Sequence, residues 1–148
     1  MFKRILVATD GSELAEKAVS KAIDLATEQD AELTAFTVVR HQAKDRMDGA
    51  LGFEAKEAER IEARRAEEAR TMLDAVVKRA EARGVRVVNS TVVKSSRVAE
   101  SILAAAAEHG SDLIVMATHG RTGLKSAVLG SETAHVLAHS EVPVLVLR

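Results

Sequence analysis

The sequence predicts an α/β fold: a single-domain, open five-stranded parallel sheet with helices on both faces. Short runs rich in β-branched residues alternate along the chain with longer segments of helical periodicity. One of these runs, 112–118, is apolar without interruption at its centre, as expected of a strand that is covered on both faces. Because strands and helices alternate, right-handed crossovers and a parallel sheet follow. A length of 148 residues fits one domain that spans 1–148.

The N-terminal elements have clear start signals. A first strand is expected over 3–8, and a turn cluster follows it. Ser12 closes that cluster as the N-cap of a helix over 13–28. The helix carries one apolar stripe at a period of 3.6 residues, formed by Leu14, Ala18, Ala22 and Leu25. A second strand, rich in β-branched residues, is expected over 32–39.

The middle of the chain predicts a loop at about 40–52 and a long charged helix at about 53–83. The first half of this helix consists of alanine and charged residues, with Glu–Arg pairs at i,i+3 spacing. These pairs are Glu57 and Arg60, Glu62 and Arg65, and Glu67 and Arg70. Each contributes only ~0.2–0.5 kcal/mol, so this half is expected to be solvated. The second half carries an apolar stripe that can pack on a sheet, and Gly84 ends the helix.

The C-terminal half continues the same alternation. A strand is expected over 85–93, and Ser95 with Ser96 is expected to cap a helix over 97–108. A fourth strand is expected over 112–118, and a glycine-bearing loop over 119–130 follows it. The remaining elements are a helix over 131–139 and a strand over 142–147 that Pro143 opens, where a missing N–H is tolerated.

Composition excludes several classes of function. The chain is 47% hydrophobic and 29% charged, which rules out disorder over its whole length. A net charge of −1 and an aromatic content of 2% predict no nucleic-acid partner. The absence of cysteine excludes a thiolate zinc site and a thiol nucleophile. Since the sequence shows no signal-peptide pattern and no run of ~20 apolar residues, we expect a cytoplasmic protein without a membrane span.

Two loops carry the candidate chemistry, because ligands of parallel sheets bind beyond the carboxyl ends of the strands. The first loop, 8–12, follows the first strand, and the second, 117–131, follows the fourth. In the second loop three glycines allow the backbone to approach an anion, and a helix start, hydroxyls and cations add to this. The residues are Gly120, Arg121, Gly123, Lys125, Gly130, Ser131 and Thr133. The alternative is that these glycines only shape a loop and cap a helix.

Individual side chains leave further alternatives open. Asp10 suits a ribose hydroxyl or a water-held Mg²⁺, and it equally suits an Asx turn on the residues that follow. His119 is placed to touch a phosphate or a hydroxyl. His135 and His139 have metal-ligand spacing but no visible third ligand, so we expect surface histidines and no metal site. Because Leu124 precedes the lysine, a Walker A motif is excluded, and we nominate no catalytic residue.

Three segments resemble the universal stress protein family: 5–12, 112–123, and the pair Gly130-Ser131 with the strand that follows it. The resemblance covers essentially the whole chain. The nucleotide-binding branch of that family carries the motif G-x-x-G-x9-G-[ST]. Ala117, Gly120, Gly130 and Ser131 fit this frame, with alanine in place of the first glycine. The added Cβ would crowd a nucleotide or require φ < 0. Because alanine is the smallest possible intrusion, binding is expected to be weakened or intact.

The resemblance implies a fold of the adenine-nucleotide α-hydrolase-like group and a site for ATP, with or without Mg²⁺. It places Asp10 by the ribose and adenine, Val38 at the adenine edge, and Ser131 with Thr133 at the phosphates. The implied nucleotide-binding residues are Ala8, Thr9, Asp10, Val38, Met116, Ala117, His119, Gly120, Arg121, Thr122, Gly123, Gly130, Ser131, Glu132 and Thr133.

The resemblance also implies an ATP-binding regulatory or adaptor protein of the stress response, with a protein partner that the sequence does not identify. Two alternatives remain. One is a slow ATPase or phosphotransferase that uses Asp10 or His119, with weak hydrolysis at most. The other is a nucleotide-independent dimeric adaptor, because Ala117 replaces the first motif glycine.

The strand Val142 to Leu147 predicts a homodimer. Valines at every second position alternate with leucines, so both faces of the strand are apolar. If this strand lies at the sheet edge, its unpaired N–H and C=O groups favour pairing with a second copy across a twofold axis.

Overall fold

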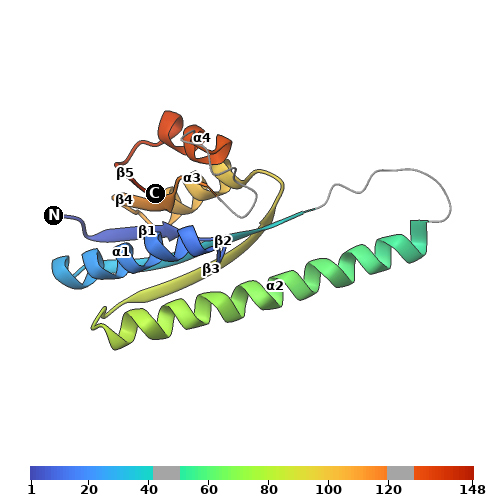
Figure 1. Ribbon diagram of the computed structural model, residues 1–148, viewed down its shortest axis with the longest axis horizontal. Coiled ribbons are helices and arrows are strands. Elements are labelled where there is room, and N and C mark those ends of the chain that lie inside the picture. The colour runs from blue at the N-terminus through green and yellow to red at the C-terminus, as the bar shows by residue number, and fades with distance from the viewer. Residues whose placement is uncertain (42–50, 120–128) are drawn as a thin grey trace.

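The computed structural model describes residues 1–41, 51–119 and 129–148, and the side chains of residues 51 and 52 are not among them (Figure 1). Most of the predicted loop at 40–52 therefore lies outside the described residues. So do the predicted site residues Gly120, Arg121, Thr122 and Gly123.

Five parallel strands form one sheet, as predicted. They are β1 (Arg4–Ala8), β2 (Glu32–Arg40), β3 (Val88–Ser95), β4 (Leu113–Ala117) and β5 (Val144–Leu147). The strand order is β3-β2-β1-β4-β5, so the chain builds outward from β1 to one edge and then returns to build the other. The order reverses between β1 and β4, which pair over Ile5–Val7. This reversal leaves a crevice for a ligand at the carboxyl ends of the two strands.

Helices cover both faces of the sheet, as predicted (Figure 1). The helices α1 (Glu13–Gln29) and α2 (Leu51–Ala82) pack on one face, and α3 (Val98–Glu108) and α4 (Ser131–His139) pack on the other. Side chains of β4 alternate between the two cores: Val115 packs among the first pair of helices and Met116 among the second. The sheet is therefore buried on both sides, which explains the continuously apolar fourth strand.

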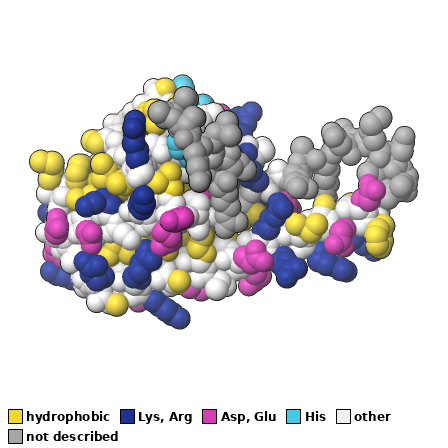
Figure 2. Space-filling view, viewed as in Figure 1, with side chains coloured by type: hydrophobic (Ala, Val, Ile, Leu, Met, Phe, Trp, Pro, Cys, Tyr) yellow, Lys and Arg dark blue, Asp and Glu magenta, His cyan; other side chains and the backbone are white. Residues whose placement is uncertain are grey.

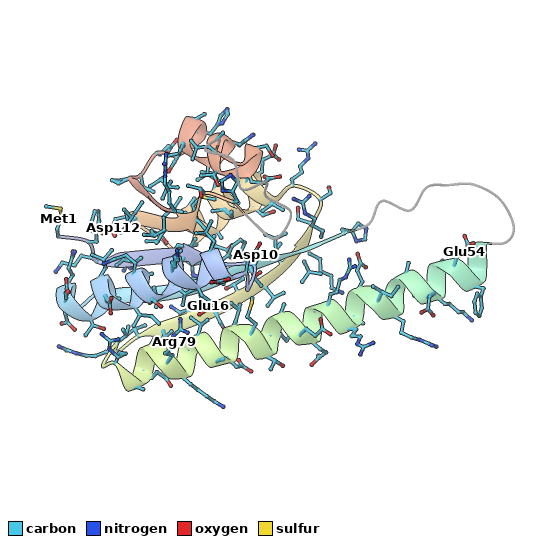
Figure 3. The ribbon with its side chains drawn as sticks, viewed as in Figure 1. Met1, Asp10, Glu16, Glu54, Arg79 and Asp112 are labelled. Carbon is cyan, nitrogen blue, oxygen red and sulfur yellow. The ribbon has the colours of Figure 1, made fainter. Side chains whose placement is uncertain are left out.

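Ion pairs fasten the C-terminal half of α2 and the turn after it to α1. Their donor–acceptor distances are 2.8 Å for Arg79 and Glu16, 2.8 Å for Arg83 and Asp24, and 2.9 Å for Arg86 and Asp30. Figure 3 shows Arg79 and Glu16 facing each other across the two helices. These pairs are exposed, so each stabilises the fold by at most about 1 kcal/mol.

The N-terminal half of α2 projects beyond the sheet, with side chains of both charge signs along it (Figures 1 and 2). Phe53 near its start is 82% exposed. Two of the three predicted i,i+3 pairs are present, Glu57 with Arg60 and Glu67 with Arg70. The third was wrong, because Glu62 pairs instead with His41 at the end of β2, at 2.5 Å. Among the described helices, none combines the length and the apolar character that a membrane span requires.

Gly84 ends α2 as predicted, with a φ of +94° that only glycine adopts without strain. The N–H of Val85 donates to the carbonyl of Ala80 at 3.1 Å. Because Val85 belongs to this helix end, β3 begins at Val88 rather than at Val85 as predicted.

Two other predicted boundaries were also wrong. The last strand begins at Val144, because Val142 is held in a turn by the hydroxyl of Ser140, which donates to its carbonyl at 2.7 Å. The N-cap of α3 is Arg97, and no cap hydrogen bond comes from its own side chain. Ser95, which was predicted to cap this helix, instead accepts the N–H of Arg97 at 3.0 Å.

Candidate functional site

A cavity of about 950 Å³ lies at the carboxyl ends of β1, β2 and β4, where the strand order reverses. Every described member of the predicted site lines it. These residues are Ala8, Thr9, Asp10, Val38, Met116, Ala117, His119, Gly130, Ser131, Glu132 and Thr133. The fold thus brings together loops that are more than one hundred residues apart in the sequence.

One wall of the cavity is apolar. Phe36 and Val38 from β2, Met116 from β4, and Val98 and Ile102 from α3 form it. A wall of this kind beside a few polar groups is typical of sites that bind an organic ligand through a flat ring or an aliphatic surface.

The helix α2 supplies a further wall that the sequence analysis did not assign to the site. Arg65, Glu68, Ala69 and Met72 line the cavity from this helix. Their spacing of i, i+3, i+4 and i+7 places them on one helical face, and Ala69 and Met72 lie on the apolar stripe that was predicted to pack on the sheet. The apolar stripe could therefore be predicted from the sequence. That it also lines the cavity depends on how α2 crosses the end of β2.

The turn after β1 is ordered by short-range hydrogen bonds. The Thr9 N–H donates to the Phe36 carbonyl at 2.9 Å, which ties the turn to β2. The Ser12 N–H donates to Oδ1 of Asp10 at 2.9 Å, so the predicted Asx turn is present. The Ser12 hydroxyl in turn accepts the Ala15 N–H at 3.2 Å and caps α1, as predicted. Asp10 is therefore held at the carboxyl end of β1, on the cavity lining (Figure 3).

The start of α4 lies very close to the end of β4. The Gly130 N–H donates to the Thr118 carbonyl at 2.9 Å. A Cβ on Gly130 would lie 2.9 Å from that same oxygen, closer than real Cβ atoms approach. Glycine is therefore required here by the close approach of two backbone segments, in addition to the predicted approach of an anion.

Thr133 has a structural bond that the sequence analysis did not anticipate. Its side chain is buried, and its hydroxyl donates to the carbonyls of Ala117 and Thr118 at 3.0 and 3.1 Å. The hydroxyl hydrogen is thereby used inside the protein. What Thr133 still offers to the cavity is its backbone N–H in the first turn of α4.

Among the described residues, no side chain caps the N-terminus of α4. Gly130 is the N-cap, and the first turn comprises Ser131, Glu132 and Thr133, all of which line the cavity. The first N–H groups of a helix have no partner within the helix, and together with the helix dipole they attract anions. The hydroxyl-bearing Ser131 at the first helical position adds one more polar group at this end of the cavity.

The carboxylate of Glu132 bonds away from the first turn of its own helix. Its Oε2 accepts the Ala99 N–H at 2.9 Å and so caps the start of α3. Its Oε1 lies 3.7 Å from Nη2 of Arg40, the last residue of β2. Glu132 lines the cavity, but its side chain bonds to α3 and Arg40, so what it can still offer to a ligand is its backbone N–H.

Ala117, the departure from the family motif, lies in regular strand. It pairs with Leu147 of β5 and is 7% exposed. Among the described residues other than glycine, Asp30 alone has a positive φ. The backbone at 117 therefore does not require glycine, and the effect of alanine reduces to the space that its methyl group takes.

The three histidines singled out from the sequence lie in different settings. Nδ1 of His119 is 2.9 Å from the Thr118 hydroxyl at the cavity wall. His135 and His139 stack with ring centroids 4.3 Å apart on α4. Within the described parts of the chain, no three histidine, aspartate or glutamate side chains gather closely enough to hold a metal ion.

Comparison with known proteins gives one consistent relationship. The model of the universal stress protein family matches residues 1–148. Universal stress protein MJ0531 of Methanocaldococcus jannaschii is 35% identical over 149 residues, which cover 100% of this chain and 83% of the relative. The structure of protein MJ0577 is 31% identical with a TM-score of 0.82 and covers 99% of this chain and 96% of its own.

A crystal structure of a universal stress protein in complex with cAMP has a TM-score of 0.71 at 22% identity and covers 99% of this chain and 97% of its own, which shows the shared fold. The match to the family model extends over every strand of the sheet and both loops that line the cavity. This chain belongs to the universal stress protein family.

Proposed function

We propose that this protein binds ATP in the cavity and acts as a nucleotide-responsive regulatory or adaptor protein of the stress response in the cytoplasm. One observation carries the proposal: the cavity joins an apolar wall to the start of α4, a helix that no described side chain caps. A nucleotide has the matching polarity, with a flat base at one end and anionic phosphates at the other. The cavity volume also falls within the range of small-molecule sites.

The base and ribose belong at the β1–β2 side of the cavity. There the apolar wall includes Val38 and Met116, and Asp10 offers a carboxylate to a ribose hydroxyl. The phosphates belong at Ser131, Glu132 and Thr133, where backbone N–H groups and the helix dipole stabilise negative charge. The relative that is known in complex with cAMP supports an adenine nucleotide as the class of ligand.

We expect Mg²⁺ to bind at this site together with the nucleotide. Mg²⁺ is usually bound by one or two carboxylates together with substrate phosphates. Asp10 supplies one such carboxylate on the cavity wall. Since the described residues form no three-ligand cluster, we expect Mg²⁺ to enter with ATP and to be held mainly by the phosphates.

The hydrogen bonds of the two candidate general bases, Asp10 and His119, favour a regulatory role over ATP hydrolysis. Asp10 is engaged by the Ser12 N–H, and His119 by the Thr118 hydroxyl. Both contacts build the loops that shape the cavity, so they support binding rather than proton transfer. Weak ATP hydrolysis at most is expected.

The homodimer through the C-terminal strand is part of the same proposal. β5 lies at one edge of the sheet, and its residues Val144–Leu147 are only half-buried within one chain. A second copy that pairs with this edge would cover them and satisfy the exposed backbone groups. Sedimentation equilibrium should give a dimer for the natural chain and a monomer for Val146→Asp. Val87→Asp, at an exposed site near the other edge, should remain dimeric.

Calorimetry of nucleotide-free protein with ATP tests the proposal directly. It should be run with and without Mg²⁺ and beside the variant Ala117→Gly, which restores the first motif glycine. Micromolar binding by the natural chain is expected, since the backbone at 117 is unstrained. Binding by Ala117→Gly alone would mean that the methyl group closes the site, and the protein would then be a nucleotide-independent adaptor. No binding by either variant would refute the proposal.

A further inference from the structure

We propose that Arg40 determines how strongly the protein prefers nucleoside triphosphates to monophosphates, by moving from Glu132 to the outer phosphates of the ligand. This inference rests on the proposed function, because it names the specificity of the same cavity. It adds a residue that lies outside the family motif and outside the loops 8–12 and 117–131, where the sequence placed the candidate chemistry.

Two observations place Arg40 at the phosphate end of the cavity. It is the last residue of β2 and lines the cavity. Its guanidinium reaches a side chain of the first turn of α4, where Nη2 lies 3.7 Å from Oε1 of Glu132. The Arg40 side chain is 64% exposed and that of Glu132 is 39% exposed. An ion pair so long and so exposed is weak, so the guanidinium is free to exchange one anion for another.

Glu132 is the less movable member of this pair. Its other carboxylate oxygen accepts the Ala99 N–H at 2.9 Å and caps α3. The carboxylate therefore stays beside the start of α4 when a ligand binds there. A negative charge at this place repels a polyphosphate, and the repulsion grows with the number of phosphates. A cation that neutralises it is needed most by a triphosphate.

Arg40 is suited to that task by its chemistry. A guanidinium presents a planar set of donors that matches two phosphate oxygens at once. Arg65 also lines the cavity, from α2, but the distance to Glu132 places Arg40 at the phosphate end. Arg40 thus pairs with Glu132 in the structure and would pair with the outer phosphates in the complex.

The test is calorimetry of ATP and AMP at a fixed Mg²⁺ concentration with Arg40→Ala. We expect ATP affinity to fall about tenfold, the equivalent of one charge-assisted hydrogen bond. AMP affinity should change less than about twofold, since its single phosphate lies at the helix start. Arg70→Ala is the matched control: it removes the same charge from an exposed site on α2 that pairs with Glu67 outside the cavity lining.

The variant Glu132→Gln should change ATP affinity in the direction opposite to Arg40→Ala. A glutamine oxygen still accepts the Ala99 N–H, so the cap of α3 is kept while the negative charge is removed. ATP affinity should rise about threefold or more, and AMP affinity should rise less.

Different results would refute the inference about Arg40 and the proposed function. If the natural chain binds ATP and Arg40→Ala matches Arg70→Ala for both nucleotides, the inference about Arg40 is refuted and the proposed function stands. A fall in ATP affinity on Glu132→Gln would also refute it. If the natural chain binds neither nucleotide, the proposed function fails and this inference fails with it. Thermal unfolding of each variant separates a loss of fold from a loss of contact.

Discussion

Three helices start at or beside the cavity, and each start is completed in a different way. α1 is capped within its own loop by Ser12, and α3 is capped by Glu132 from another helix. α4 has no side-chain cap among the described residues. The first N–H groups of a helix have no partner within the helix and attract anions, so we propose the start of α4 as the phosphate site. The starts of α1 and α3, whose N–H groups are engaged by side chains, are expected to serve stability instead.

The largest expected effect comes from the start of α4 itself. In Gly130→Val the added side chain collides with the Thr118 carbonyl, so α4 must move away from β4. We expect a loss of about 1–3 kcal/mol of unfolding free energy from overpacking and a fall of at least about tenfold in ATP affinity. Chemical denaturation and calorimetry measure the two effects.

Gly84→Ala is the control for this change. It strains a positive φ at a position where an added Cβ meets nothing within 4 Å. It should lower stability and leave ATP affinity unchanged. Equal losses of affinity in both variants would mean that the effect of Gly130→Val is general destabilisation.

A smaller effect is expected from the bond that positions α4. Thr133→Val removes the hydroxyl that donates to Ala117 and Thr118 while keeping the shape of the side chain. Stability should fall by about 0.5–1.5 kcal/mol, and ATP affinity should fall a few-fold as the helix start loosens. Thr133→Ser keeps the hydroxyl and should bind ATP like the natural chain. If Thr133→Val also binds like the natural chain, Thr133 does not position the phosphate site.

The smallest effect on binding is expected at the self-capped helix. Ser12→Ala removes the hydrogen bond to the Ala15 N–H and should cost about 1 kcal/mol of stability. Its ATP affinity should stay within about twofold of the natural value, because the start of α1 is not the phosphate site. An affinity loss as large as that of Gly130→Val would remove the distinction between the helix starts.

The sequence predicted those features that depend on neighbouring residues. The cap at Ser12 and the helix end at Gly84 have short-range signals, and the structure confirms both. The five-stranded parallel sheet, also confirmed, followed from the alternation of strand and helix patterns, each of which is local. The predicted cap of α3 was wrong, because the cap comes from Glu132, which lies thirty-three residues away in the chain. No local pattern reports a partner at that distance.

The lack of a local signal also explains why Arg40 and Arg65 were not predicted to line the cavity. Arg40 ends a strand and Arg65 lies in a charged helix, where exposed arginines are common. Their place on the cavity follows from where β2 ends and from how α2 packs across that end, which depends on contacts between segments far apart in the sequence. Glu132 and Thr133 were predicted at the cavity, but the structural bonds of their side chains depend on the packing of α4 against α3 and β4.

We propose above all that the backbone N–H groups at the start of α4 hold the phosphates. Amide chemical shifts and hydrogen exchange, recorded by NMR with and without saturating ATP, test it most directly. We expect large shifts and slowed exchange at Ser131, Glu132 and Thr133, and small changes at the capped starts of α1 and α3. ATP binding that leaves these three amides unchanged while it perturbs the start of α1 or α3 would contradict the claim.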